Sequence, residues 1–184
     1  DNNVRMALKY AVNRQELVDK VLLGHGTVGN DTPISARTKY FNPDLPQREY
    51  DPEMAKSYLK KSGLDTIDIP LSVAEIGFPG ATKAGELFAN SAKAAGININ
   101  LTRESDDGYF ENVWLKKPFV ASYWGQPVSC DMTFSIAFAA GAPWNETHFN
   151  NPRFEELLLS GRKTADDAAR KAIYFEMQQI LYDE

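Results

Sequence analysis

Aromatic and amide side chains gather between Phe119 and Phe149, at the two points where glycine and proline interrupt the apolar sequence. Ligands of α/β proteins are commonly held where strands end, because backbone groups there are unpaired and the loops are free to vary. These side chains can stack on a solute and exchange hydrogen bonds with it. The candidate ligand-binding residues are Tyr123, Trp124, Gly125, Gln126, Asp131, Trp144 and Asn145.

Packing in the core is the alternative for each of these aromatic side chains, since aromatic residues bury large areas. Trp124 differs from an ordinary core tryptophan in its setting, because a Gly-x-Pro turn follows it directly. Such a turn is typical of a residue presented at the end of a strand. We therefore expect Trp124 at the mouth of a ligand cleft, with Gln126 and Asn145 as hydrogen-bond partners of the solute.

No pattern in the sequence is typical of catalysis. The two histidines, His25 and His148, lie far apart and have no ligand or base at a characteristic spacing. The one cysteine, Cys130, has no evident base and is interpreted as a small buried residue. We expect a protein that is not an enzyme, with no catalytic residue, no metal site and no cofactor.

The segment from Gly24 to Gly29 matches the pattern G-x-G-x-x-G of dinucleotide-binding proteins. That motif binds phosphate only where it follows a strand and opens a helix. Here the glycines follow a helical pattern and lead into a loop with Pro33, which favours a helix C-cap. A nucleotide-binding α/β enzyme domain that uses Gly24–Gly29 stays an alternative function, and so does a non-catalytic protein-interaction module.

Composition narrows the class of partner. The 184 residues are 43% hydrophobic, which is enough for a full core, and their formal net charge is −5. Nucleic acids and anionic membranes need clustered lysine and arginine, and the sequence has no such cluster. The chain starts without methionine and ends inside a helical pattern, so we expect a piece of a longer protein that does not include the signal peptide.

The periodicity of apolar residues predicts alternating helices and strands. Helical spacing from Val4 to Leu22 is divided at Asn13, which has the character of a cap. The segments Ile67–Val73 and Ile97–Leu101 alternate at period two and flank a helical pattern, which predicts a βαβ unit with parallel strands. The remaining expected elements are a helix from Asp51-Pro52, a helix over Asp106–Leu115, a third strand over Phe119–Trp124, and helices that begin at Asn151 and Thr164.

Several segments, in order, resemble those of one known family. Residues Val4 to Val18, VRMALKYAVNRQELV, are similar to the segment that marks the peptide/dipeptide/nickel class of solute-binding proteins of bacterial ABC importers. The resemblance continues at Tyr50–Lys56, Ala94–Ile97 and Phe154–Leu158. It spans nearly the whole chain.

The resemblance implies an α/β fold, namely one lobe of a two-lobed periplasmic binding protein, with a mixed sheet and a βαβ unit flanked by helices. Residues 1–184 would be a single domain, the second lobe, without the first lobe and the returning C-terminal segment. The protein would be a periplasmic monomer that passes a small polar solute to the membrane permease subunits of an importer.

The resemblance also bears on the solute. In peptide binders of the family, an aspartate three residues after the strand-end tryptophan pairs with the α-amino group of the ligand. That position holds Pro127 here, and the nearest carboxylate is Asp131. The resemblance implies a small polar solute, namely an oligopeptide, a modified peptide or an opine-like solute. The missing aspartate favours an opine-like, modified or sugar-containing solute over a peptide with a free α-amino group.

Overall fold

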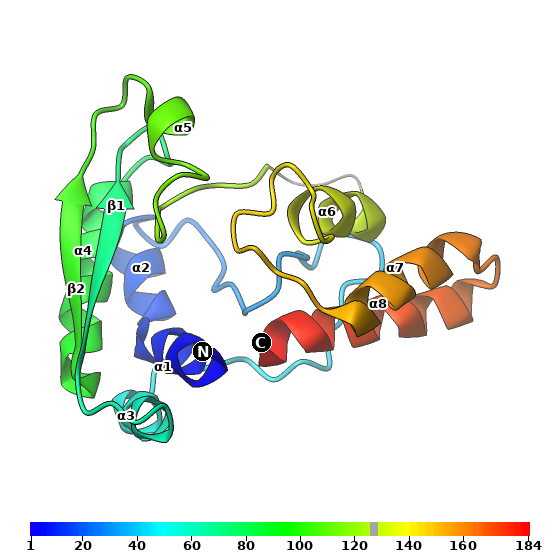
Figure 1. Cartoon of the computed structure of the whole chain (residues 1–184), viewed down its shortest axis with the longest axis horizontal. Coiled ribbons are helices and arrows are strands. Elements are labelled where there is room, and N and C mark those ends of the chain that lie inside the picture. Colours follow the sequence, from blue (N-terminus) through cyan, green and yellow to red (C-terminus); the bar gives the residue numbers. More distant parts are fainter. Residues whose placement is uncertain (126–128) are drawn as a thin grey trace. The chain divides into compact units, whose positions relative to one another are not determined.

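The computed structural model describes residues 1–125 and 129–184, and Gln126 lies outside them (Figure 1). The chain falls into two compact units. The first unit comprises Asp1–Gly29 and Arg48–Tyr123, and the second comprises Asn30–Gln47 and Trp124–Glu184. The expected single domain over 1–184 stays a prediction.

Three helices of the first unit begin at side-chain caps, and the caps at Asn13 and Asp51 were predicted from the sequence. They are α1 (Asn2–Ala11), α2 (Arg14–Lys20) and α3 (Pro52–Lys61). The side chain of Asn13 accepts a hydrogen bond from the amide of Glu16 and so separates α2 from α1. Asp51 caps α3 in the same way. Each cap satisfies an amide that the first turn of a helix leaves without a partner.

The predicted βαβ unit is confirmed. Strand β1 (Ile67–Val73) leads through α4 (Ala81–Ala92) and the 3-10 turn η1 (Lys93–Ala95) to β2 (Ile97–Arg103). The strands pair in parallel, with Ile67 opposite Ile97. Gly96, between η1 and β2, has a φ of 79°, and a Cβ atom there would lie 2.7 Å from the backbone oxygen of Asp65. Only glycine fits this junction, because it has no Cβ and accepts a positive φ.

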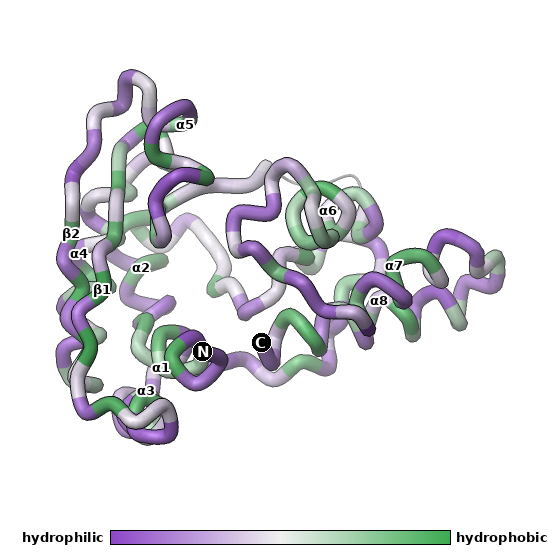
Figure 2. Tube along the Cα trace, in the orientation of Figure 1, coloured by the Kyte–Doolittle hydropathy of each residue, from purple (hydrophilic) through white to green (hydrophobic). Residues whose placement is uncertain are grey.

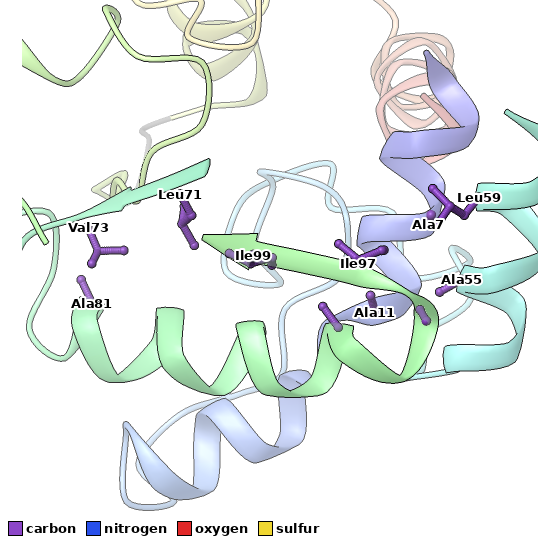
Figure 3. Close-up of a cluster of buried hydrophobic side chains, with 11 residues drawn as sticks. Ala7, Ala11, Ala55, Leu59, Leu71, Val73, Ala81, Ile97 and Ile99 are labelled. Carbon is purple, nitrogen blue, oxygen red and sulfur yellow. The ribbon is translucent and has the colours of Figure 1, made fainter. Parts of the chain in front are cut away.

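The core of the first unit lies between the two strands and the helices α1, α3 and α4 (Figure 3). Many of its members are alanine, which lets α1 and α3 pack closely on each other and α4 lie close to the strands. Gly85 extends this pattern on α4, because a Cβ there would lie 2.6 Å from Leu101 Cδ1. The labelled core residues are Ala7, Ala11, Ala55, Leu59, Leu71, Val73, Ala81, Ile97 and Ile99.

The expected third strand over Phe119–Trp124 is wrong as a strand. This segment makes one isolated parallel bridge, between Ser72 and Val120. The Ser72 amide donates to the oxygen of Phe119, and the Ala121 amide donates to the oxygen of Ser72. The bridge ends there, because β1 itself ends at Val73. All strand pairs among the described residues are parallel. A mixed sheet also contains an antiparallel pair, and these residues form none.

The short helix before this segment is also smaller than its pattern predicts. We expected a helix over Asp106–Leu115, whereas α5 runs only over Tyr109–Asn112. Gly108 has a φ of 72° and Leu115 a φ of 59°. Both lie in the left-handed region, which interrupts a right-handed helix on either side.

The second unit contains α6 (Cys130–Ala137), α7 (Pro152–Lys163) and α8 (Asp167–Asp183). Hydrophobic and hydrophilic residues alternate along α7 and α8, as amphipathic packing requires (Figure 2). The expected helix start at Thr164 is wrong, because Thr164 closes α7 and Asp166 caps α8. An aspartate two residues further along competes better for this position.

An aromatic core holds the three helices of the second unit together. Phe134 of α6 meets Phe154 of α7 edge to face, with ring centroids 5.3 Å apart, and both side chains are fully buried. Tyr174 of α8 packs against Phe134. None of the described helices, in either unit, is long and apolar enough to cross a membrane.

Candidate functional site

Trp124 and Trp144 form an exposed pair of indoles in the second unit. Their ring centroids lie 6.0 Å apart with an interplanar angle of 61°. Trp124 Nε1 donates a hydrogen bond of 2.7 Å to Glu146 Oε1. The two side chains remain 40% and 48% exposed, so their rings are available to a solute. We call Trp124, Trp144 and Glu146 the indole pair and its carboxylate.

Asn145 belongs to the loop that carries Trp144 and Glu146, and only 7% of its surface is exposed. Its Nδ2 donates to the backbone oxygens of Ala139 and Phe149. Its Oδ1 accepts from the Phe149 amide and from the Thr147 hydroxyl. These four bonds use the full capacity of the amide. Asn145 thus fixes the loop, and no donor or acceptor of its side chain is left for a solute.

Asp131 lies elsewhere in the second unit, in the first turn of α6. Its Oδ1 accepts a hydrogen bond of 2.8 Å from Arg162 Nε on α7. Asp131 also lines a cavity of about 390 Å³, which we call the basic cavity. Its wall is formed by Lys39, Tyr40, Ser129, Cys130, Asp131, Gly161, Arg162, Arg170 and Tyr174. Neither indole is part of that wall.

The other predicted residues are divided between the units. Tyr123 belongs to the first unit, is 61% exposed, and meets Phe110 edge to face at 6.5 Å. Gly125 belongs to the second unit, is exposed, and leaves open space where a side chain would stand. The part of the predicted set that the structure brings together is therefore Trp124 with Trp144, held by Asn145.

Sequence reasoning missed Glu146 and the arginines of the basic cavity. Glu146 was available as a signal, because it follows Trp144 and Asn145 directly and is the one acidic residue of that loop. Arg162 and Arg170 carried no such signal, since arginines at the end of one helix and the start of another are usually solvated.

Cys130 is buried, and its Sγ lies 3.1 Å from the backbone oxygen of Lys39. Burial raises the pKa of this thiol to about 12. A thiol with that pKa stays protonated at neutral pH and is a poor nucleophile. The structure confirms the interpretation of Cys130 as a small buried residue.

The glycine motif lacks the context that nucleotide binding requires. Gly24 follows α2, has a φ of 80°, and its amide donates to the oxygen of Val18. The C-cap of α2 is Val21, and Gly24 belongs to the turn that follows it. Within the part of the chain that the structure describes, no three histidine, cysteine, aspartate or glutamate side chains are grouped so as to hold a metal ion.

Two of the matched relatives are named as binding proteins. The chain is 25% identical over 199 residues to the dipeptide-binding protein of Escherichia coli (strain K12), covering 100% of this chain and 36% of that protein. It is 24% identical over 204 residues to the nickel-binding periplasmic protein of the same organism, covering 98% of this chain and 38% of that one. The chain therefore spans less than half the length of these relatives.

Solved structures share the fold. NikZ from Campylobacter jejuni, in complex with Ni(L-His), matches with a TM-score of 0.87 and 20% identity, over 100% of this chain and 40% of that chain. DppA from Helicobacter pylori, in complex with the peptide STSA, matches with a TM-score of 0.86 and 19% identity, over 100% of this chain and 36% of that chain. The expected fold of a periplasmic binding protein lobe is thus confirmed.

A family model decides the classification. The model described as "Bacterial extracellular solute-binding proteins, family 5 Middle" matches residues 1–146, well over half of the chain. With the relatives and the fold already given, the chain belongs to family 5 of the bacterial extracellular solute-binding proteins.

Proposed function

We propose that this chain is the second lobe of a periplasmic receptor that binds a peptide-like or other small polar solute and delivers it to the permease subunits of an ABC importer. The coarse role rests on the family, because the matched relatives are named as dipeptide-binding, nickel-binding and glutathione-binding proteins. The observation that carries the site is the exposed indole pair, anchored by Glu146 and Asn145.

The indole pair suits a solute with both apolar and polar parts. Two tilted aromatic faces offer a large, rigid contact area, which is characteristic of residues that contribute strongly to binding. Glu146 is partly exposed and positions Trp124 through its hydrogen bond. A carboxylate next to an aromatic face also attracts a cationic group of the solute. In this proposal Trp124 and Trp144 contact the solute, and Asn145 positions the loop.

The remaining predicted residues keep secondary roles in the proposal. Gly125 leaves the space next to Trp124 open, and exposed Tyr123 is a further aromatic candidate on the first unit. Gln126 stays a predicted hydrogen-bond partner. A nickel complex is the second candidate solute, because one relative and one solved structure carry nickel in their names. The described residues, however, bring no metal-binding group of side chains together.

The test uses Trp124→Ala in the full-length protein. Mass spectrometry first identifies the solute that copurifies, and calorimetry then measures the affinity of wild type and variant for it. We expect affinity to fall by about 2 kcal/mol or more, as it does for aromatic anchors, while the thermal midpoint changes little because the side chain is 40% exposed.

The matched control is Leu159→Ala, which removes an exposed apolar side chain from α7. This variant should keep the affinity of wild type. An unchanged affinity of Trp124→Ala, combined with a collapsed thermal midpoint, would show that Trp124 is a packing residue and would remove it from the site.

A further inference from the structure

The basic cavity of the second unit is lined by three cationic side chains, and two of them are matched by carboxylates. Arg162 Nε donates to Asp131 Oδ1 at 2.8 Å. Lys39 Nζ lies 2.6 Å from Asp167 Oδ1, which also accepts from the Tyr40 hydroxyl. Each of these ion pairs is locally neutral, so neither by itself calls for an anion.

Arg170 is the third cation and has no such partner. Its Nε and Nη2 both donate to the backbone oxygen of Thr164, at the end of α7. No carboxylate of the described residues lies within ion-pair distance of its guanidinium, and its Nη1 makes no hydrogen bond to them. Arg170 nevertheless lines the cavity. Asp167 interacts with Arg170 only at longer range and is already paired with Lys39, so three cations here are balanced by two carboxylates.

Tyr174, one turn further along α8, offers an unused donor to the same space. The residue is only 4% exposed, and its hydroxyl makes no hydrogen bond to a described residue. Gly161 makes room for the phenol, since a Cβ there would lie 3.2 Å from Tyr174 Oη. The hydroxyl is not among the buried polar atoms without a partner, so it is accessible to a group bound in the cavity.

The phenol also stays a donor at neutral pH. Burial raises the pKa of Tyr174, and the charge of Asp131 raises it further, while Arg170 and Arg162 act against both. The phenol therefore interacts electrostatically with Asp131, Arg162 and Arg170. All three of these residues line the cavity.

We propose that the basic cavity binds a small monocarboxylate, held by Arg170 Nη1 and the Tyr174 hydroxyl. A carboxylate carries two acceptor oxygens in one plane, which suits a guanidinium edge together with a neighbouring hydroxyl. Its single charge matches the one uncompensated cation. A dianion such as phosphate would bring one negative charge more than the cavity balances. A volume of about 390 Å³ accommodates a short carboxylic acid.

The test measures the thermal midpoint of the full-length protein during titration with sodium acetate at pH 7, with sodium chloride added to constant ionic strength. Specific binding to the folded state raises the midpoint in a saturable manner. We expect Arg170→Gln to weaken the affinity for acetate at least tenfold. Tyr174→Phe, which keeps the packed ring and removes the hydroxyl, should weaken it several-fold.

The matched control is Lys171→Gln, which removes the same charge from the neighbouring position of α8, outside the cavity wall. This variant should respond to acetate as wild type does. The proposal is overturned if acetate gives no saturable shift, if Lys171→Gln loses as much affinity as Arg170→Gln, or if sodium phosphate binds more tightly than acetate. Circular dichroism of Tyr174→Phe establishes that the variant is folded.

Discussion

Each of the two units of this chain is stabilised internally by its own set of interactions. The first unit is built on the parallel backbone pairing of β1 and β2 and on an alanine-rich core. The second unit has an aromatic core as well, and in addition buried polar side chains connect its irregular segments to its helices. Gln178, fully buried on α8, accepts from the Asn42 amide and donates to the oxygen of Tyr40, more than 130 positions away in sequence.

This difference decides how each unit tolerates change. Backbone pairing and apolar packing depend on a pattern of residue types, so related side chains can replace one another at moderate cost. A buried amide with several defined partners depends on one side chain, because its loss leaves backbone groups buried without hydrogen bonds. The first unit is therefore specified by periodicity, and the second by individual residues such as Gln178 and Asn145.

The largest effect is expected in the first unit, from Ile97→Ala. Ile97 is fully buried between the strands and helices, and such truncations cost about 2 to 5 kcal/mol of unfolding free energy. Urea denaturation measures the loss. Asn98→Ala, on the exposed face of β2, is the control and should cost far less. If both variants were equally stable, packing in this core would not be what stabilises the first unit.

Gln178→Leu should have a smaller but still large effect in the second unit. Leucine has a similar size, yet it leaves the Asn42 amide and the Tyr40 oxygen without their partner. A buried group left unbonded costs about 1 to 3 kcal/mol. The control is Gln179→Leu, because this neighbour on α8 is exposed and its side chain donates to Asp183 at the surface. A Gln178→Leu protein as stable as wild type in urea would contradict the contrast between the units.

The smallest effect is expected from replacing Glu104 in the first unit. Glu104 contacts a segment whose apolar residues follow neither a helical nor a strand pattern. Hydrogen bonds from Lys117 and Ser72 lower the pKa of this carboxyl below its ordinary value of 4.5. A lowered pKa stabilises the folded chain above pH 4.5, and this contribution is lost as the pH falls through the folded-state pKa. An ion pair such as Lys117–Glu104 contributes about 0.2 to 1 kcal/mol to the free energy of unfolding.

We therefore expect Glu104→Gln to be slightly less stable than wild type at pH 7 and equally stable in acid. Urea denaturation at a series of pH values down to 3 checks this. Glu111→Gln, at an exposed position of α5, should show no such convergence. A gap between Glu104→Gln and wild type that persisted at the lowest pH would mean that the carboxylate charge is not involved.

The regular part of the fold follows from the sequence, and the irregular part does not. The caps at Asn13 and Asp51 and the two alternating strands act over a few residues, so local patterns predict them. The segment after Phe119 was predicted as a strand because it is rich in β-forming residues. Whether such a segment pairs beyond one bridge depends on where β1 ends, which is a tertiary property.

The candidate site was predictable to a similar degree. A Gly-x-Pro turn behind Trp124 indicates a presented side chain, and the structure does leave this indole 40% exposed. The role of Asn145 was not predictable, because an amide can bond either a solute or its own loop, and only the folded loop distinguishes the two. The basic cavity joins residues from Lys39 to Tyr174, and no local pattern connects positions so far apart.

The tilted arrangement of Trp124 and Trp144 has an optical consequence. Two indoles with centroids 6.0 Å apart and planes inclined by 61° are close enough, and suitably angled, for their excited states to couple. The pair should therefore give a circular dichroism couplet that a single tryptophan cannot produce. Because the geometry depends on the loop held by Asn145, this couplet reports on the loop itself, without any attached label.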